Sequence, residues 1–197
     1  ETRGDGEVGE DVTHNVIQFV NVPLTMPYKG ELIVDGEAII DRSSFDVINQ
    51  DGQYKNQRNL VSGTVRQLDS KIVAYRKVKF IAWKLYSFTD PIVDQDSGEI
   101  YSAKSYFSRL WILKNLGFQV VPSLVVRFCL DPRRELSWKE SSDAITGECA
   151  KFGYPIDGLV GTFDDVAYGE SLGNTNHHPK CSMAFKFYQE RNETTLL

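Results

Sequence analysis

The sequence predicts an α+β fold made mainly of antiparallel sheets with flanking helices. Several segments have the alternating or continuous apolar pattern of strands: residues 31–40, 78–86, 120–130, 156–164 and 181–188. Helical patterns are interspersed among them at 41–49, 59–68, 103–116 and part of 131–150. Because strands and helices do not alternate regularly, as they do in βαβ units, the strands are expected to pair antiparallel.

The ends of these elements have recognisable signals. Asp and Ser side chains at the start of 41–49 can cap a helix there. The helix at 103–116 carries apolar residues at helical spacing and is expected to end at Gly117. Pro, Asp, Ser and Gly cluster in residues 89–102, which predicts an exposed loop.

The bulk composition narrows the class of protein. The chain has 197 residues, enough for one sizeable domain, with 41% hydrophobic and 25% charged residues. No apolar run is long enough to cross a bilayer, and three widely spaced cysteines argue against a disulfide framework, so we expect a reducing, cytoplasmic setting. The net charge of −5 means that any DNA contact must come from local basic patches or from parts of the protein outside these residues.

Two carboxylates are candidate site residues. Glu37 shares one face of its strand with isoleucines, where a carboxylate is costly to bury unless it is paired. A partly exposed sheet face explains it, and so does a contact to ribose hydroxyls or a hard cation. Asp157 precedes Gly158 at the mouth of a strand, where the pair is either a turn or a metal or nucleotide contact.

Three cations and one aromatic residue complete the candidates. Arg58 and Arg66 could hold a phosphate from one helix, although a solvated helix face is the commoner explanation. Lys186 lies within an aromatic strand, which suits a phosphate partner or an edge that blocks aggregation. Trp83 is either a core residue or a stacking platform for a base. His177, His178 and Cys181 match no standard zinc spacing.

Taken together and in order, these segments resemble the adenylation domain of bacterial-type NAD⁺-dependent DNA ligases. Thr2-Arg3-Gly4-Asp5-Gly6 looks like the stretch that follows the family's nucleophile, and Gly36-Glu37 resembles its third nucleotidyltransferase motif. Asn56-Gln57-Arg58-Asn59, with Arg66-Gln67-Leu68-Asp69, is close to a family signature. Ile81-Ala82-Trp83, Ile156-Asp157-Gly158-Leu159-Val160 and Ala184-Phe185-Lys186-Phe187 look like the adenine-packing segment and the fourth and fifth motifs.

The resemblance implies a nucleotidyltransferase fold of the DNA ligase and mRNA capping enzyme type, and a role in DNA replication and repair. In this family a lysine attacks NAD⁺, AMP stays on the enzyme, and the AMP then activates a DNA 5′-phosphate so that a nick is sealed. By position, Trp83 would stack on adenine, Glu37 would hold the ribose, and Arg3 would lie beside the nucleotide. Arg58 and Arg66 would serve phosphate and DNA ends, Lys186 would contact the α-phosphate, and Asp157, with Glu37, would bind Mg²⁺. The implied partners are NAD⁺ and nicked duplex DNA, with no membrane.

The resemblance also implies that residues 1–197 are one adenylation domain of a longer chain. The Lys-x-Asp-Gly motif of the nucleophile is expected shortly before Glu1, so the fragment alone is expected to be inactive. An N-terminal part that binds nicotinamide mononucleotide, and OB, zinc and helix-hairpin-helix regions, are expected elsewhere in that chain. Residue 162 is Thr where the family usually has a lysine.

Two alternatives follow from these departures. The chain could be a degenerate or split ligase-like module that binds nucleotide or DNA without catalysis. The other is an ATP-dependent ligase. The sequence of residues 56–69 argues against it, because this motif resembles that of the NAD⁺-dependent branch.

Overall fold

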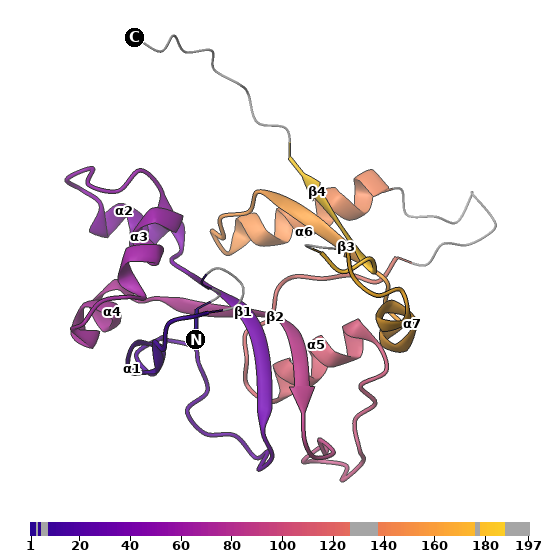
Figure 1. Cartoon of the computed structure of the whole chain (residues 1–197). Coiled ribbons are helices and arrows are strands. Elements are labelled where there is room, and N and C mark those ends of the chain that lie inside the picture. The colour runs from indigo at the N-terminus through magenta and orange to yellow at the C-terminus, as the bar shows by residue number, and fades with distance from the viewer. Residues whose placement is uncertain (3, 5–7, 127–137, 176–177, 188–197) are drawn as a thin grey trace.

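The computed structural model describes residues 1–2, 4, 8–126, 138–175 and 178–187 (Figure 1). In this part of the chain the elements are, in order, α1 (Thr13–Val16), β1 (Leu32–Ile39), α2 (Arg42–Ile48), α3 (Gln57–Thr64), α4 (Ser70–Arg76), β2 (Lys79–Phe88), α5 (Tyr106–Asn115), α6 (Trp138–Lys151), β3 (Gly158–Thr162), α7 (Val166–Ser171) and β4 (Ser182–Lys186). Both sheets are antiparallel pairs, β1 with β2 and β3 with β4, which confirms the α+β class.

Side chains with short polar groups begin most of the helices. Asp41 caps α2, Asn56 caps α3, Asp69 caps α4 and Asp165 caps α7, each by accepting a hydrogen bond from a backbone N–H of the first turn. Ser105 and Ser108 form a reciprocal capping box at the start of α5. The same helix ends as expected at Gly117, whose φ of 95° allows Phe118 N to bond to Leu113 O.

The β1–β2 sheet separates two hydrophobic clusters along its length. One cluster gathers Ile40, Phe45, Leu60, Val73 and Val78 under α2, α3 and α4. The other joins Ala82 and Leu85 of β2 to Leu110, Ile112 and Leu113 of α5. Phe80 packs against both clusters, so the long strand β2 ties the two halves of the core together.

Strand β2 contains two irregularities that place aromatic side chains outside the core. The pairing register steps from Asp35↔Lys84 to Gly36↔Ala82, so Trp83 has no partner on β1. It steps again from Ile33↔Ser87 to Val34↔Leu85, so Tyr86 has none either. Such β-bulges re-aim the extra side chain. Trp83 and Tyr86 are exposed, whereas Ala82 and Leu85 are fully buried.

Backbone hydrogen bonds connect the second sheet to the rest of the fold. Tyr106 N, at the start of α5, donates to Asp164 O, and Val166 N donates to Lys104 O. Arg42 N donates to Gly153 O, in the segment that leads into β3. In Figure 1 the β3–β4 pair lies beside α6, with α7 below it and the N-terminal helices on the other side of β1 and β2.

Some expectations were wrong in detail. In the described part of the predicted strand 120–130 only Val120 forms a bridge, parallel to Ala82, because Pro122 interrupts the run; residues 127–130 lie outside the described residues. The helix predicted at 59–68 begins earlier and ends at Thr64, and neither α4 nor α7 was predicted. The loop at 89–102 is largely exposed, but Ile92 within it is buried against α5.

Candidate functional site

Asp157 and Lys186 form an ion pair at one end of the β3–β4 sheet. Asp157 lies directly before β3 and Lys186 is the last residue of β4, opposite Gly158 in the register. Lys186 Nζ donates to Asp157 Oδ2 at 2.7 Å, and the two side chains are 73% and 59% exposed. The lysine hydrogen bond holds the pKa of Asp157 below its usual value. The result is an ionised carboxylate beside a cation, both open to solvent.

Arg58 adds a second positive charge to this neighbourhood. It is the second residue of α3, where the Asn56 cap fixes the start of the helix. Its side chain is exposed, and its charge also contributes to lowering the pKa of Asp157. The charge of Arg58 thus acts on the same carboxylate that Lys186 contacts.

Arg66 has a partner elsewhere. Its Nε lies 2.7 Å from Glu10 Oε2, and both side chains are more than half exposed. Glu10 belongs to the N-terminal segment, whose backbone bonds to Thr2. Arg66 therefore contacts the start of the chain rather than the Asp157–Lys186 pair. Arg3, predicted to lie beside the nucleotide, is outside the described residues.

Glu37 and Trp83 lie on the face of the β1–β2 sheet that is turned away from α5. Glu37 pairs with Ile81, and both point to the opposite side from Gly36 and Ala82. Trp83 is 44% exposed, as expected for a side chain that its bulge turns out of the core. Asp35 and Lys84 are paired on the same outer face. Alternation along β1 could have predicted that Asp35 lies on the outer face with Glu37. The same could not be predicted for Lys84, because the bulge at Trp83 interrupts the alternation along β2.

Gly36 is required by the close packing of this sheet. A Cβ atom at residue 36 would lie 2.3 Å from Phe80 Cζ and 2.6 Å from Ile81 O. Phe80 cannot move easily because it packs against both hydrophobic clusters. The Gly36-Glu37 pair thus combines a residue that lets β2 approach with a carboxylate on the outer face.

Thr162 lies at the far end of β3 from Asp157. Its register partner is Ser182, and the two hydroxyl oxygens are 3.0 Å apart. The position is neutral, so it supplies no cation. In the described part of the chain no three His, Cys, Asp or Glu side chains are grouped closely enough to hold a metal ion.

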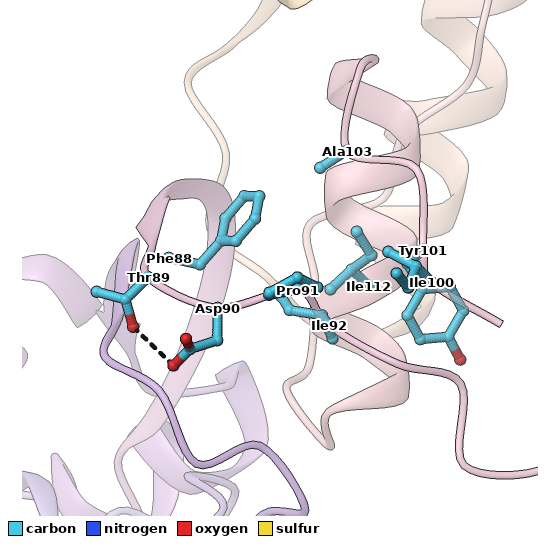
Figure 2. Close-up of a pocket in the computed structure, with 9 residues that line it drawn as sticks. All are labelled: Phe88, Thr89, Asp90, Pro91, Ile92, Ile100, Tyr101, Ala103 and Ile112. Atoms are coloured by element: carbon cyan, nitrogen blue, oxygen red, sulfur yellow. Dashed lines mark hydrogen bonds between the residues drawn. The ribbon is translucent and has the colours of Figure 1, made fainter. Parts of the chain in front are cut away.

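Two surface cavities lie away from these residues. A cavity of about 310 Å³ is bounded by residues 88–92, 100–103 and Ile112 of α5 (Figure 2). Thr89 Oγ1 donates to Asp90 Oδ2 at 3.2 Å at its rim (Figure 2). A larger groove of about 540 Å³ lies between α5, residues 118–124 and α6. Neither cavity includes a residue predicted for the site.

No helix in the described ranges is long and apolar enough to span a membrane.

Comparison with known proteins identifies the class to which this α+β domain belongs. The sequence model of the NAD-dependent DNA ligase adenylation domain matches residues 1–190, and the chain belongs to this family.

Individual relatives are full-length ligases. The chain is 44% identical over 200 residues to a DNA ligase of Lachnoclostridium phytofermentans, and this match covers 99% of the chain and 28% of that protein. It is 41% identical over 201 residues to a DNA ligase of Ruminiclostridium cellulolyticum, covering 100% of the chain and again 28% of the relative. A DNA ligase of Brachyspira hyodysenteriae is 35% identical over 204 residues. The chain thus spans less than a third of the length of these curated relatives.

Proposed function

We propose that residues 1–197 are the nucleotidyltransferase domain of a longer, cytoplasmic NAD⁺-dependent DNA ligase that seals nicks in duplex DNA. Membership of the adenylation-domain family supports this, together with relatives named DNA ligase that are several times longer. The single observation that carries the proposal is the Asp157–Lys186 ion pair. The resemblance assigns Lys186 to the α-phosphate, and the ion pair leaves this lysine open to solvent.

In this proposal the outer face of the β1–β2 sheet holds the nucleoside half of NAD⁺. Trp83 offers an exposed indole on which adenine can stack, and such stacking contributes about 1–3 kcal/mol per base. Glu37, on the same face, is exposed, and its carboxylate oxygens can accept hydrogen bonds from ribose hydroxyls. The bulge turns Trp83 outward, so that its indole and the Glu37 carboxylate can contact the adenine and the ribose of one nucleoside.

The β3–β4 end would hold the phosphate. Lys186 can donate a charge-assisted hydrogen bond to an α-phosphate oxygen, and Asp157 keeps the ammonium oriented toward it. Arg58 would add positive charge as phosphate oxygens gain negative charge in the transition state. Arg66 would contact DNA ends after exchanging its partner Glu10 for a phosphate, since an exposed ion pair contributes only about 0–1 kcal/mol.

Asp157 and Glu37 are the exposed carboxylates that would hold the magnesium ion implied by the resemblance. Mg²⁺ prefers oxygen ligands and usually keeps several waters and substrate phosphates, so one or two carboxylates suffice. Asp157 stays ionised because its pKa is lowered, and only its Oδ2 is engaged by Lys186. When bound, the ion would supply Lewis acidity and charge neutralisation at the phosphate.

Transfer of AMP is the experiment that tests this proposal. The longer protein that contains this chain is incubated with NAD⁺ and, separately, with ATP, and its intact mass is measured. We expect an AMP adduct with NAD⁺ and none with ATP. The 197-residue chain itself should gain no adduct with either, because it contains no Lys-x-Asp-Gly.

A non-catalytic, ligase-like module is the second candidate. Thr162, held in a neutral hydroxyl contact with Ser182, favours it, because the family usually has a lysine at this position. Absence of an adduct on the longer protein, with retained binding of AMP, would support this second candidate instead.

A further inference from the structure

A hydrogen-bond network outside the proposed site connects the two halves of that site, which are the Trp83 face of the β1–β2 sheet and the Asp157–Lys186 end of the β3–β4 sheet. Asn21 Nδ2 donates to Gln119 Oε1 at 2.8 Å, and Gln119 Nε2 donates to the hydroxyl of Tyr154. All three side chains are half-buried. The three residues come from segments far apart in the sequence, so the network is a genuinely tertiary contact.

One end of the network is fixed to the strand that carries Trp83. Asn21 bonds to both backbone groups of Phe80, accepting from its N–H at 2.7 Å and donating to its carbonyl at 2.8 Å. The carbonyl of Gln119 accepts from Ala82 N at 2.8 Å. The backbone of Gln119 is therefore hydrogen-bonded to Ala82, the residue directly before Trp83.

The other end is fixed to the segment that carries Asp157. Tyr154 precedes Asp157 by three residues, a reach of at most about 10 Å of extended chain. Its neighbour Gly153 accepts from Arg42 N, and the Tyr154 ring stacks on Phe152 with centroids 5.4 Å apart.

We infer that Tyr154, through Gln119, is a positioning residue that sets the distance between the base-binding face at Trp83 and the phosphate-binding pair Asp157–Lys186. This inference rests on the proposed function. A nucleotide that spans both halves is held tightly only when their separation matches it, and misplacements of about 1 Å are known to be costly. A nucleoside that touches only the Trp83 face should not sense the separation.

This difference gives a direct test on the 197-residue chain. Calorimetry measures the Kd values of AMP and adenosine for the wild-type chain and for Tyr154→Phe, which loses only the hydroxyl. We expect the ratio of the adenosine Kd to the AMP Kd to fall about fivefold, the effect of one net hydrogen bond, while the adenosine Kd stays within about twofold. Tyr154 and Gln119 border the 540 Å³ groove. Tyr154→Phe only removes an oxygen atom there, so the substitution introduces no clash.

A second variant and a matched control complete the design. Gln119→Met removes both side-chain hydrogen bonds of Gln119, including the one to Tyr154. Adding Tyr154→Phe to Gln119→Met should therefore change the ratio little, because the bond that it removes is already lost. Tyr101→Phe is the control, since Tyr101 also donates a hydrogen bond, to Asp94 Oδ2 at 2.6 Å, and Asp94 is not one of the network's residues. It should leave the ratio unchanged.

The outcomes separate the two claims. An unchanged ratio in both Tyr154→Phe and Gln119→Met, or an equal loss of both ligands, would overturn the positioning role and leave the proposed function standing. Equal affinity of the wild-type chain for AMP and adenosine would overturn the proposed phosphate site, and the inference with it.

Discussion

Lys186 Nζ lies 2.7 Å from Asp157 Oδ2, although the two residues are 29 positions apart in the sequence. The antiparallel register of β3 and β4 brings them together, because Lys186 pairs with the residue after Asp157. Both side chains are largely exposed, so the pair contributes little to stability. Its retention of full charge in solvent is what suits it to a phosphate ligand.

Removal of the Lys186 ammonium should separate binding from stability. Lys186→Met is expected to weaken AMP binding by about tenfold to a hundredfold, since a charged hydrogen bond contributes about 1.5–3 kcal/mol. The free energy of unfolding should change by less than about 1 kcal/mol, because the ion pair is exposed. Calorimetry with AMP and urea unfolding measure the two effects. Lys180→Met, at another exposed lysine, is the control and should leave both unchanged.

Trp83 and Tyr86 offer a matched pair of exposed aromatic residues. Both are extra residues at bulges of β2, but only Trp83 lies next to the register pair of Gly36, the residue before Glu37. Trp83→Ala is expected to weaken both AMP and adenosine by about tenfold to a hundredfold, which is the contribution of one stacked base. Tyr86→Ala should leave both affinities unchanged. Equal losses in the two variants would argue that Trp83 has no specific role.

The ion pair between Lys79 and Asp41 should make stability depend on pH. Burial alone raises the pKa of Asp41, but hydrogen bonds from Lys79, Ser44 and Ser43 outweigh it, so this pKa lies well below its ordinary value. A carboxyl with a depressed native pKa stabilises the fold above its unfolded pKa of about 3.9, and this contribution is lost as the pH falls toward the native pKa.

Asp41→Asn tests this dependence while it keeps an N-cap for α2. At pH 7 the substitution should destabilise by about 1–3 kcal/mol, because it removes a charged and mostly buried hydrogen bond. The difference between the free energies of unfolding of Asp41→Asn and wild type, measured with urea, should become steadily smaller below about pH 4. Asp46→Asn, in an exposed pair with Arg42, should have an effect under about 0.5 kcal/mol at either pH. A difference that is constant with pH would contradict this account of Asp41.

Two glycines should respond to alanine in opposite directions. Gly36→Ala places a Cβ against the Phe80 ring and the Ile81 carbonyl and should destabilise by about 1–3 kcal/mol. Gly63, inside α3, has open space around its Cα, so Gly63→Ala should stabilise by about 0.5–1 kcal/mol through its higher helix propensity. Thermal unfolding of both variants, with opposite shifts in Tm, is the measurement.

Local pattern predicted the elements whose signals are strong. Asp41 and Gly117 mark helix ends by their own chemistry, and the apolar runs around Val34 and Leu85 predicted strands that the structure contains. The short helices α4 and α7 were missed because each spans only two turns or fewer, and a brief apolar period is not distinctive.

The arrangement of the candidate site followed less directly from sequence. The Asp157–Lys186 contact depends on a register between strands that no local pattern fixes. The partner of Arg66 was unexpected, since an ion pair with Glu10 links segments more than fifty residues apart. The bulge that exposes Trp83 is likewise a property of two strands together, so the strand pattern alone favoured a core residue over a stacking platform.

A structure of this chain with AMP bound tests the central claim most directly, because that claim is spatial. Crystals grown with saturating AMP should show adenine stacked on Trp83 and a phosphate oxygen within hydrogen-bond distance of Lys186 Nζ. AMP bound on another surface, or with its phosphate directed away from Lys186, would contradict a single nucleotide site built from these two sheets.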